Sequence, residues 1–114
     1  MIKWIPAAGF LSVAVTATAT TFAQSYVVPQ ELWDRPRSGR AVLEQPAVRQ
    51  AVNACLAQPG SRLVVRHGPG QDAQLAAEEM RSWLAALALE PGRIALLGDL
   101  KAGEPLRLDV VSDK

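Results

Sequence analysis

The side chains that could do chemistry in this chain are few, because His67 is its one histidine and Cys55 its one cysteine. The two lie 12 positions apart, and one His with one Cys does not make the ligand set that a metal site requires. Ser61 and Ser82 leave a Ser-His-Asp arrangement open, but neither lies in the pattern of a nucleophile elbow. We therefore expect no catalytic residues, no bound metal and no cofactor.

The most suggestive local pattern is Leu-Val-Val-Arg-His-Gly over residues 63–68. It resembles the first strand of the histidine phosphatase superfamily, which ends in Arg-His-Gly. The resemblance implies that His67 is a phosphoryl nucleophile and Arg66 a phosphate ligand. That chemistry also needs a second histidine and further arginine and acidic groups, whereas only 47 residues follow His67. We interpret the match as coincidental.

The elements that must position these residues follow from the apolar pattern. Apolar residues recur at helical spacing over residues 46–58 and 72–89, and each run ends in Pro-Gly or Glu-Pro-Gly. Short apolar or alternating runs predict strands at residues 63–65, 94–97 and 106–111. This order predicts an α/β fold, a two-layer sandwich with two helices on one face of a small mixed sheet.

Residues 1–23 have the features of a secretory signal peptide. Lys3 precedes an uncharged apolar run over residues 4–15, and small residues lead up to a predicted cleavage site before Gln24. The run is shorter than the roughly 20 residues that a membrane span needs, so we expect no stable span after cleavage. The sequence therefore predicts a periplasmic or secreted protein.

The remaining chain divides into an irregular segment over residues 24–40, where 26–28 could form a short strand, and a small α/β domain over residues 41–114. One of the 12 basic residues precedes residue 24, so 11 basic and 11 acidic residues remain. A neutral chain of this kind is not expected to bind nucleic acid or an anionic membrane surface. Its one cysteine excludes an intramolecular disulfide.

Several features of residues 40–111 follow one another in the order of a known family: a helix ending in Gln-Pro-Gly at 58–60, a strand ending at His67, a helix carrying Arg81 before Trp-Leu, a turn at 89–94, and an alternating last strand at 106–111. In this layout the chain resembles a shortened, degenerate OmpA-like C-terminal domain, the family that binds peptidoglycan in the periplasm. The resemblance implies the same α/β sandwich and a peptidoglycan contact.

The resemblance also implies roles for particular residues. The family's helix arginine, here Arg81, holds the carboxylate of the peptide's diaminopimelate, and an aspartate after the strand holds its ammonium. Here the strand runs into Arg-His-Gly-Pro at 66–69, so that aspartate is missing, and Asp72 is the nearest substitute. Losing one charge-assisted hydrogen bond costs about 1.5–3 kcal/mol. Alternatively, Arg81 is a solvated helix residue paired with Glu78.

We therefore expect an exported, non-enzymatic accessory or binding protein of the cell envelope. Its sharper form keeps a weakened peptidoglycan contact through Arg81, His67 and Asp72. The alternative is a protein–protein interaction module of an envelope complex, anchored by Trp33, since aromatic and arginine residues are typical of interface anchors. A third alternative is a phosphatase-like fragment centred on His67, which requires a further arginine to converge on the imidazole.

Overall fold

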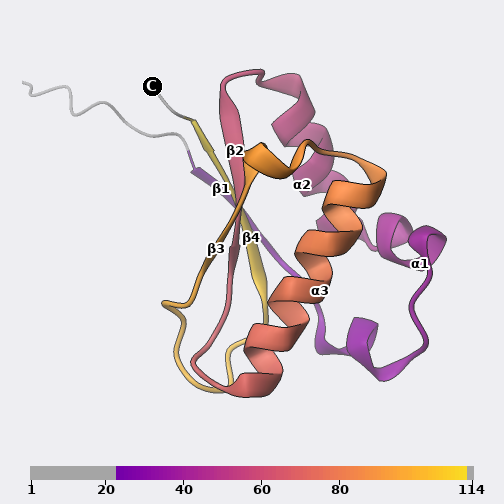
Figure 1. Cartoon of the computed structure of the whole chain (residues 1–114), viewed down its shortest axis with the longest axis vertical. Helices are drawn as coiled ribbons and strands as arrows, with labels where there is room; N and C mark the ends of the chain where they lie inside the picture. Colours follow the sequence, from indigo (N-terminus) through magenta and orange to yellow (C-terminus); the bar gives the residue numbers. More distant parts are fainter. Residues whose placement is uncertain (1–22, 113–114) are drawn as a thin grey trace, which may run out of the picture.

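The computed structural model describes residues 23–112 as a four-stranded sheet covered by helices (Figure 1). Along the chain the elements are β1 (Ala23–Val27), the 3-10 helix η1 (Gln30–Asp34), α1 (Gly39–Glu44), α2 (Pro46–Ala57), β2 (Ser61–Arg66), α3 (Gln71–Leu87), the 3-10 helix η2 (Pro91–Arg93), β3 (Ile94–Leu97) and β4 (Arg107–Ser112). Apart from Ala23, the predicted signal peptide lies outside the described residues. No helix within residues 23–112 has the length and apolar character of a membrane span.

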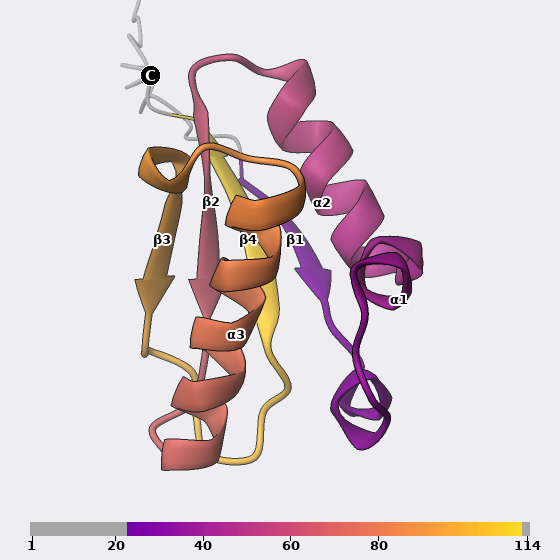
Figure 2. The same cartoon turned by 45° about the vertical axis from the view of Figure 1, so that its right-hand side comes forward.

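The sheet has the order β1-β4-β2-β3, with β2 and β3 parallel and the other two pairings antiparallel. The parallel pair needs a crossover, and α3 supplies it. Figure 2 shows α2 and α3 on the same face of the sheet, where α2 contacts β1, β2 and β4, and α3 contacts β2 and β3. The predicted α/β fold, a two-layer arrangement on a mixed sheet, is confirmed.

The core lies between this face and the helices. Alternation in β2 and β4 pairs Leu63 with Val110 and Val65 with Leu108, and these four side chains are buried. The helices cover them with one stripe each, made of Val48, Ala51, Val52 and Cys55 from α2 and of Ala77, Met80 and Leu84 from α3. These 3.6-residue and two-residue periods are what places apolar side chains on one face of each element.

Residues 24–40, which we expected to be irregular, hold β1, η1 and the first turn of α1. β1 is ordered by its partner β4, with Tyr26 opposite Leu108, which lies far along the chain. Val28 and Leu32 are buried in the core. The segment therefore belongs to the folded unit, because long-range pairing and burial override its weak local preferences.

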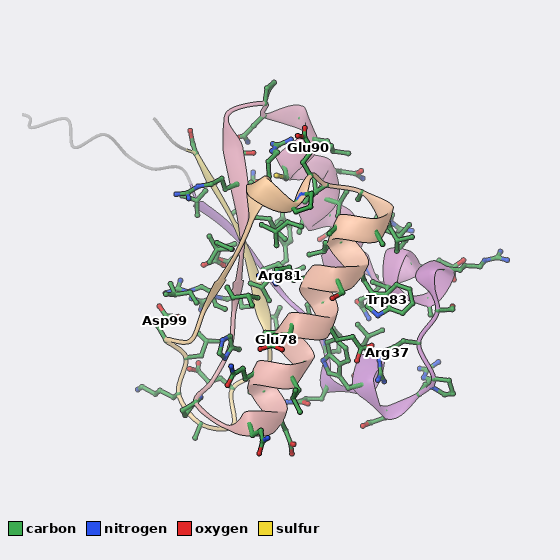
Figure 3. The ribbon with its side chains drawn as sticks, viewed as in Figure 1. Arg37, Glu78, Arg81, Trp83, Glu90 and Asp99 are labelled. Atoms are coloured by element: carbon green, nitrogen blue, oxygen red, sulfur yellow. The ribbon has the colours of Figure 1, made fainter. Side chains whose placement is uncertain are left out.

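Arg37 fastens this N-terminal segment to α3 (Figure 3). Its guanidinium lies over the Trp33 ring, 5.2 Å from the centroid, and donates to Trp33 O at 3.1 Å. It also forms a two-point ion pair with Glu79 of α3, whose carboxylate accepts a further hydrogen bond from Trp83 Nε1 at 3.0 Å. The hydrogen bond from Arg37 lowers the pKa of Glu79 below its ordinary value.

A second arginine closes the C-terminal end of α2. Arg93 Nη2 donates to Cys55 O at 2.7 Å and to Gln58 O at 3.1 Å, and Arg93 Nε donates to Ser61 O at 3.0 Å. The last carbonyls of a helix have no partner within the helix. Arg93, the last residue of η2 directly before β3, therefore caps the C-terminal end of α2. Cys55 lies in the core beside it.

No described helix covers the other face of the sheet (Figure 2), and this face carries the charged side chains of Arg66, Arg107 and Asp109. Arg66 binds Asp99 and donates to Asp109 Oδ2 at 2.7 Å, and Arg107 lies 3.3 Å from Asp109 Oδ1. These carboxylates raise the pKa of Arg66, and Arg66 lowers the pKa of Asp99. Asp109 is only 4% exposed, so the ion pairs compensate a buried charge.

Candidate functional site

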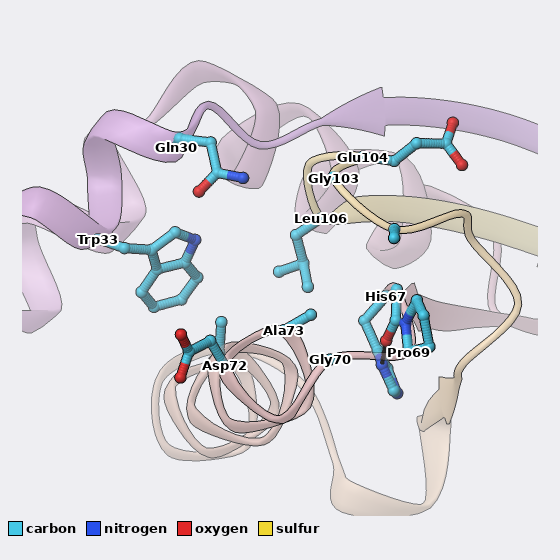
Figure 4. A pocket seen from close by; sticks show the side chains of 13 residues that line it. Gln30, Trp33, His67, Pro69, Gly70, Asp72, Ala73, Gly103, Glu104 and Leu106 are labelled. Atoms are coloured by element: carbon cyan, nitrogen blue, oxygen red, sulfur yellow. Dashed lines mark hydrogen bonds between the residues drawn. The ribbon is translucent and has the colours of Figure 1, made fainter.

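A cavity of about 340 Å³ lies where β2 ends and α3 begins. We call it the β2–α3 cavity. Its walls come from four segments: η1, the turn between β2 and α3, the first turns of α3, and the loop between β3 and β4. The residues that bear on function are Gln30, Trp33, His67, Asp72, Glu104 and Leu106. Figure 4 shows Trp33 and Asp72 on one side and His67 with Pro69 on the other.

His67 is held by the loop that follows β3. Its backbone N donates to Leu97 O and its carbonyl accepts from Leu100 N, each at 3.0 Å. Nδ1 lies 2.8 Å from Gly68 O, and a carbonyl can only accept, so Nδ1 carries the proton and Nε2 is the acceptor of the neutral ring. The ring packs against Gly98, where a Cβ would lie 2.8 Å from Cε1. Glycine at 98 therefore makes room for the imidazole.

Asp72 lies in the first turn of α3, where a carboxylate is favoured by the helix dipole. It is exposed, and no described residue pairs with its carboxylate. Glu104 also lines the cavity, but its Oε1 accepts a hydrogen bond from Lys101 N at 2.6 Å. No lysine or arginine is among the described lining residues. The free carboxylate of Asp72 thus gives the cavity a negative charge.

Three of the four residues singled out from the sequence line this cavity, namely His67, Asp72 and Trp33. Trp33 is half-buried. Trp33 is therefore part of the cavity wall, and Arg37 lies over its ring.

Arg81 lies elsewhere. It follows Asp72 by nine residues, which places it half a turn around α3 and about 13.5 Å further along the helix axis. It is exposed and lines none of the cavities described. Arg81 is thus solvated, as the alternative interpretation has it, but no ion pair joins it to Glu78 among the described residues, and Glu78 accepts from Gln74 Nε2 at 3.3 Å. Arg81 and Asp72 therefore cannot grip one small ligand.

Arg66 and His67 do not form a phosphate site. Neighbouring residues at the end of a strand point to opposite faces; Arg66 binds Asp99 and Asp109 on the open face, and His67 lines the cavity on the helix side. No described arginine converges on the imidazole. Among the described residues, no group of three His, Cys, Asp or Glu side chains could hold a metal ion.

Sequence reasoning missed the residues that complete the site. Gln30, Glu104 and Leu106 come from segments with no catalytic or binding pattern, and they reach the cavity because β4 returns beside β2 and carries its preceding loop with it. The only signal for this loop was its glycines. Gly103 has a φ of +87°, a conformation that favours glycine, and it lines the cavity.

The class of site is thus a small, partly apolar binding cavity with one unpaired carboxylate. Compared with known protein families, with curated proteins and with solved structures, the chain matches none of them.

Proposed function

We propose that the chain is an exported, non-enzymatic binding protein of the cell envelope, and that the β2–α3 cavity binds an ammonium-bearing group on a short apolar stem. The observation that carries the proposal is the free carboxylate of Asp72 beside the Trp33 ring, in a cavity whose described lining has no lysine or arginine. A bound ammonium supplies the missing charge. The stem packs on Trp33, Ala73 and Leu106.

Diaminopimelate of peptidoglycan has such a group. The resemblance to OmpA-like domains over residues 40–111 is the reason for naming this ligand, and α2, β2, α3, β3 and β4 follow one another in the order of that layout. The aspartate that the family places after its strand has a physical substitute in Asp72, which lines the same cavity as His67. The envelope location rests on the signal peptide predicted over residues 1–23.

The contact is weakened because Arg81 lies too far from Asp72 to hold the ligand's carboxylate. A ligand carboxylate has a partial replacement at the start of α3, whose N-cap residue Gly70 gives the helix no side-chain cap. The first N–H groups of a helix are orphan donors and favour negative charge. A charged side chain gives a stronger bond than they do, so we expect modest affinity.

The test is cosedimentation with insoluble peptidoglycan, using the protein purified after expression of the whole chain. The wild type is expected to sediment, and Asp72→Asn is expected to bind about tenfold less, since one charge-assisted hydrogen bond is lost. Asp34→Asn removes an exposed carboxylate outside the cavities described and is the matched control. Arg81→Ala is expected to bind as the wild type does. Equal sedimentation of Asp72→Asn and the wild type would refute the proposal.

A further inference from the structure

The bond at which the signal peptide is predicted to be cleaved lies inside β1. Cleavage before Gln24 cuts the peptide bond between Ala23 and Gln24, and β1 begins at Ala23. Both residues pair with β4, Ala23 with Val111 and Gln24 with Val110. In the folded chain the two residues that flank this bond are therefore part of the sheet.

Backbone pairing and a buried side chain hold β1 on β4. Directly after the strand, Val28 N donates to Leu106 O at 2.9 Å, and the Val28 side chain is fully buried. The register continues from this pair without a break, so the alternation of an antiparallel ladder directs the N–H groups of Tyr26 and Gln24 toward β4. The nitrogen of the bond to be cleaved thus lies on the paired side of the strand.

This arrangement keeps a peptidase away from the bond. Proteolysis of a folded chain acts on its opened form, and exposed loops rather than paired strands are the usual sites of cleavage. β4 occupies one edge of β1, and α2 contacts the strand from the helix side of the sheet (Figure 2). The bond becomes accessible when β1 leaves β4.

The partner of β1 comes late in the chain. β1 is the first strand that the structure describes and β4, Arg107–Ser112, is the last. As an edge strand β1 pairs with β4 alone. When the N-terminal residues emerge first during synthesis and export, β1 has no partner in the sheet until residues 107–112 arrive. This order leaves an interval in which the bond before Gln24 is accessible.

We propose that the pairing of β1 with β4 controls maturation: the bond before Gln24 is cleaved only while β1 is free of the sheet, and folding closes the site. The inference rests on the export that is part of the proposed function, and it adds the state in which the chain must be processed. A precursor that folds first hides the bond. Removal of the signal peptide therefore precedes completion of the sheet, and the chain is exported unfolded.

The experiment incubates the purified whole chain, residues 1–114, with a purified bacterial signal peptidase in detergent micelles, and mass spectrometry follows the product that begins at Gln24. Leu63→Asp places a charge at a fully buried position and is expected to keep the chain unfolded. It is expected to be cleaved at least about tenfold faster than the folded wild type, because proteolysis follows the population of the open form. Circular dichroism in the same micelles checks the folded state of each.

A reversible cross-link tests the role of β1 itself. Val27 and Arg107 lie opposite each other on β1 and β4. The alternation of the ladder makes them a non-hydrogen-bonded pair, whose Cα atoms lie about 4.5 Å apart, within the range of a disulfide. Val27→Cys/Arg107→Cys is expected to be cleaved severalfold more slowly when oxidised than when reduced, with the disulfide verified by mass spectrometry. The matched control is the wild type, whose buried Cys55 is free, and its cleavage is expected to be equal under both conditions.

The outcomes separate this inference from the export on which it rests. If the folded wild type is cleaved as fast as Leu63→Asp, or if oxidation leaves the cleavage of Val27→Cys/Arg107→Cys unchanged, control by β1 is refuted and the proposed export stands. If Leu63→Asp is not cleaved before Gln24, the predicted signal peptide is wrong and this inference fails with it.

Discussion

Replacement of Arg93 by methionine is expected to destabilise the fold by roughly 2–4 kcal/mol. The side chain donates to three carbonyl oxygens, those of Cys55, Gln58 and Ser61. The first two carbonyls also accept backbone hydrogen bonds, from Gln58 N at 3.2 Å and from Ser61 N at 2.9 Å. The loss is therefore close to that of the charge-assisted hydrogen bonds of one guanidinium, because no helix-end carbonyl is left without a donor. Methionine retains the apolar stem, so the substitution isolates the guanidinium.

Urea unfolding followed by tryptophan fluorescence and circular dichroism measures this loss. The midpoint for Arg93→Met is expected to fall by roughly 2 M at an unchanged slope, since the exposed surface of the unfolded state is the same. Arg93→Lys retains the charge but not the planar guanidinium, so its urea midpoint is expected to lie between those of the wild type and Arg93→Met. Arg49→Met changes an exposed arginine on the same helix and is expected to move the midpoint little. A loss for Arg93→Met no larger than that for Arg49→Met would refute the capping role.

Three further substitutions change the cavity wall, the ion pair between Arg37 and Glu79, and the core. Gly98→Ala places a Cβ 2.8 Å from Cε1 of His67, so the single histidine Hε1 resonance is expected to shift in NMR spectra and peptidoglycan binding to fall severalfold. The pKa of Glu79 is lowered by Arg37; this pair therefore stabilises the fold above pH 4.5, the ordinary value, and less as pH falls. Glu79→Gln is expected to flatten the loss of stability below that pH, as measured by urea unfolding at a series of pH values. Leu63→Ala removes a fully buried side chain, and its urea midpoint is expected to report a loss of about 2–5 kcal/mol.

The regular helices and strands could be predicted because the periodic spacing of their apolar residues lies within each segment of the sequence. The alternation of Leu106, Leu108 and Val110 places these side chains inside, and so does the predicted stripe of α2 with the exception of Leu56, which is 52% exposed. On α3 the spacing of Ala76, Met80, Trp83, Leu84 and Leu87 predicts the buried face, but the observed face is shifted slightly, since Ala77 is buried and Leu87 is 40% exposed. Apolar residues on either side of the stripe make its centre ambiguous, and only the position of the sheet decides it.

A short strand at residues 26–28 could be suggested from the sequence, but the bounds of β1 (Ala23–Val27) and the ion pair between Arg37 and Glu79 could not, because both depend on distant partners. Tyr26 pairs with Leu108 and Arg37 with Glu79, and neither pair has a local signal. The residues of the site likewise divide into those with a local signal and those brought in from distant segments. His67 and Asp72 lie close in sequence and could be foreseen together, whereas Trp33 joins them only through η1, and Arg81 leaves them because of the helical rotation between residues 72 and 81.

The central claim is that the β2–α3 cavity binds an ammonium group at Asp72. The most direct measurement is a titration of the ¹⁵N-labelled protein with a soluble peptidoglycan fragment that contains diaminopimelate, followed by ¹H–¹⁵N NMR spectra. We expect the non-proline amides within residues 67–73 and 102–106 to shift together, the amide of the exposed Glu90 to stay in place, and Asp72→Asn to need about tenfold more ligand for the same shifts. Shifts centred on Arg81 instead, or shifts unchanged by Asp72→Asn, would contradict this claim.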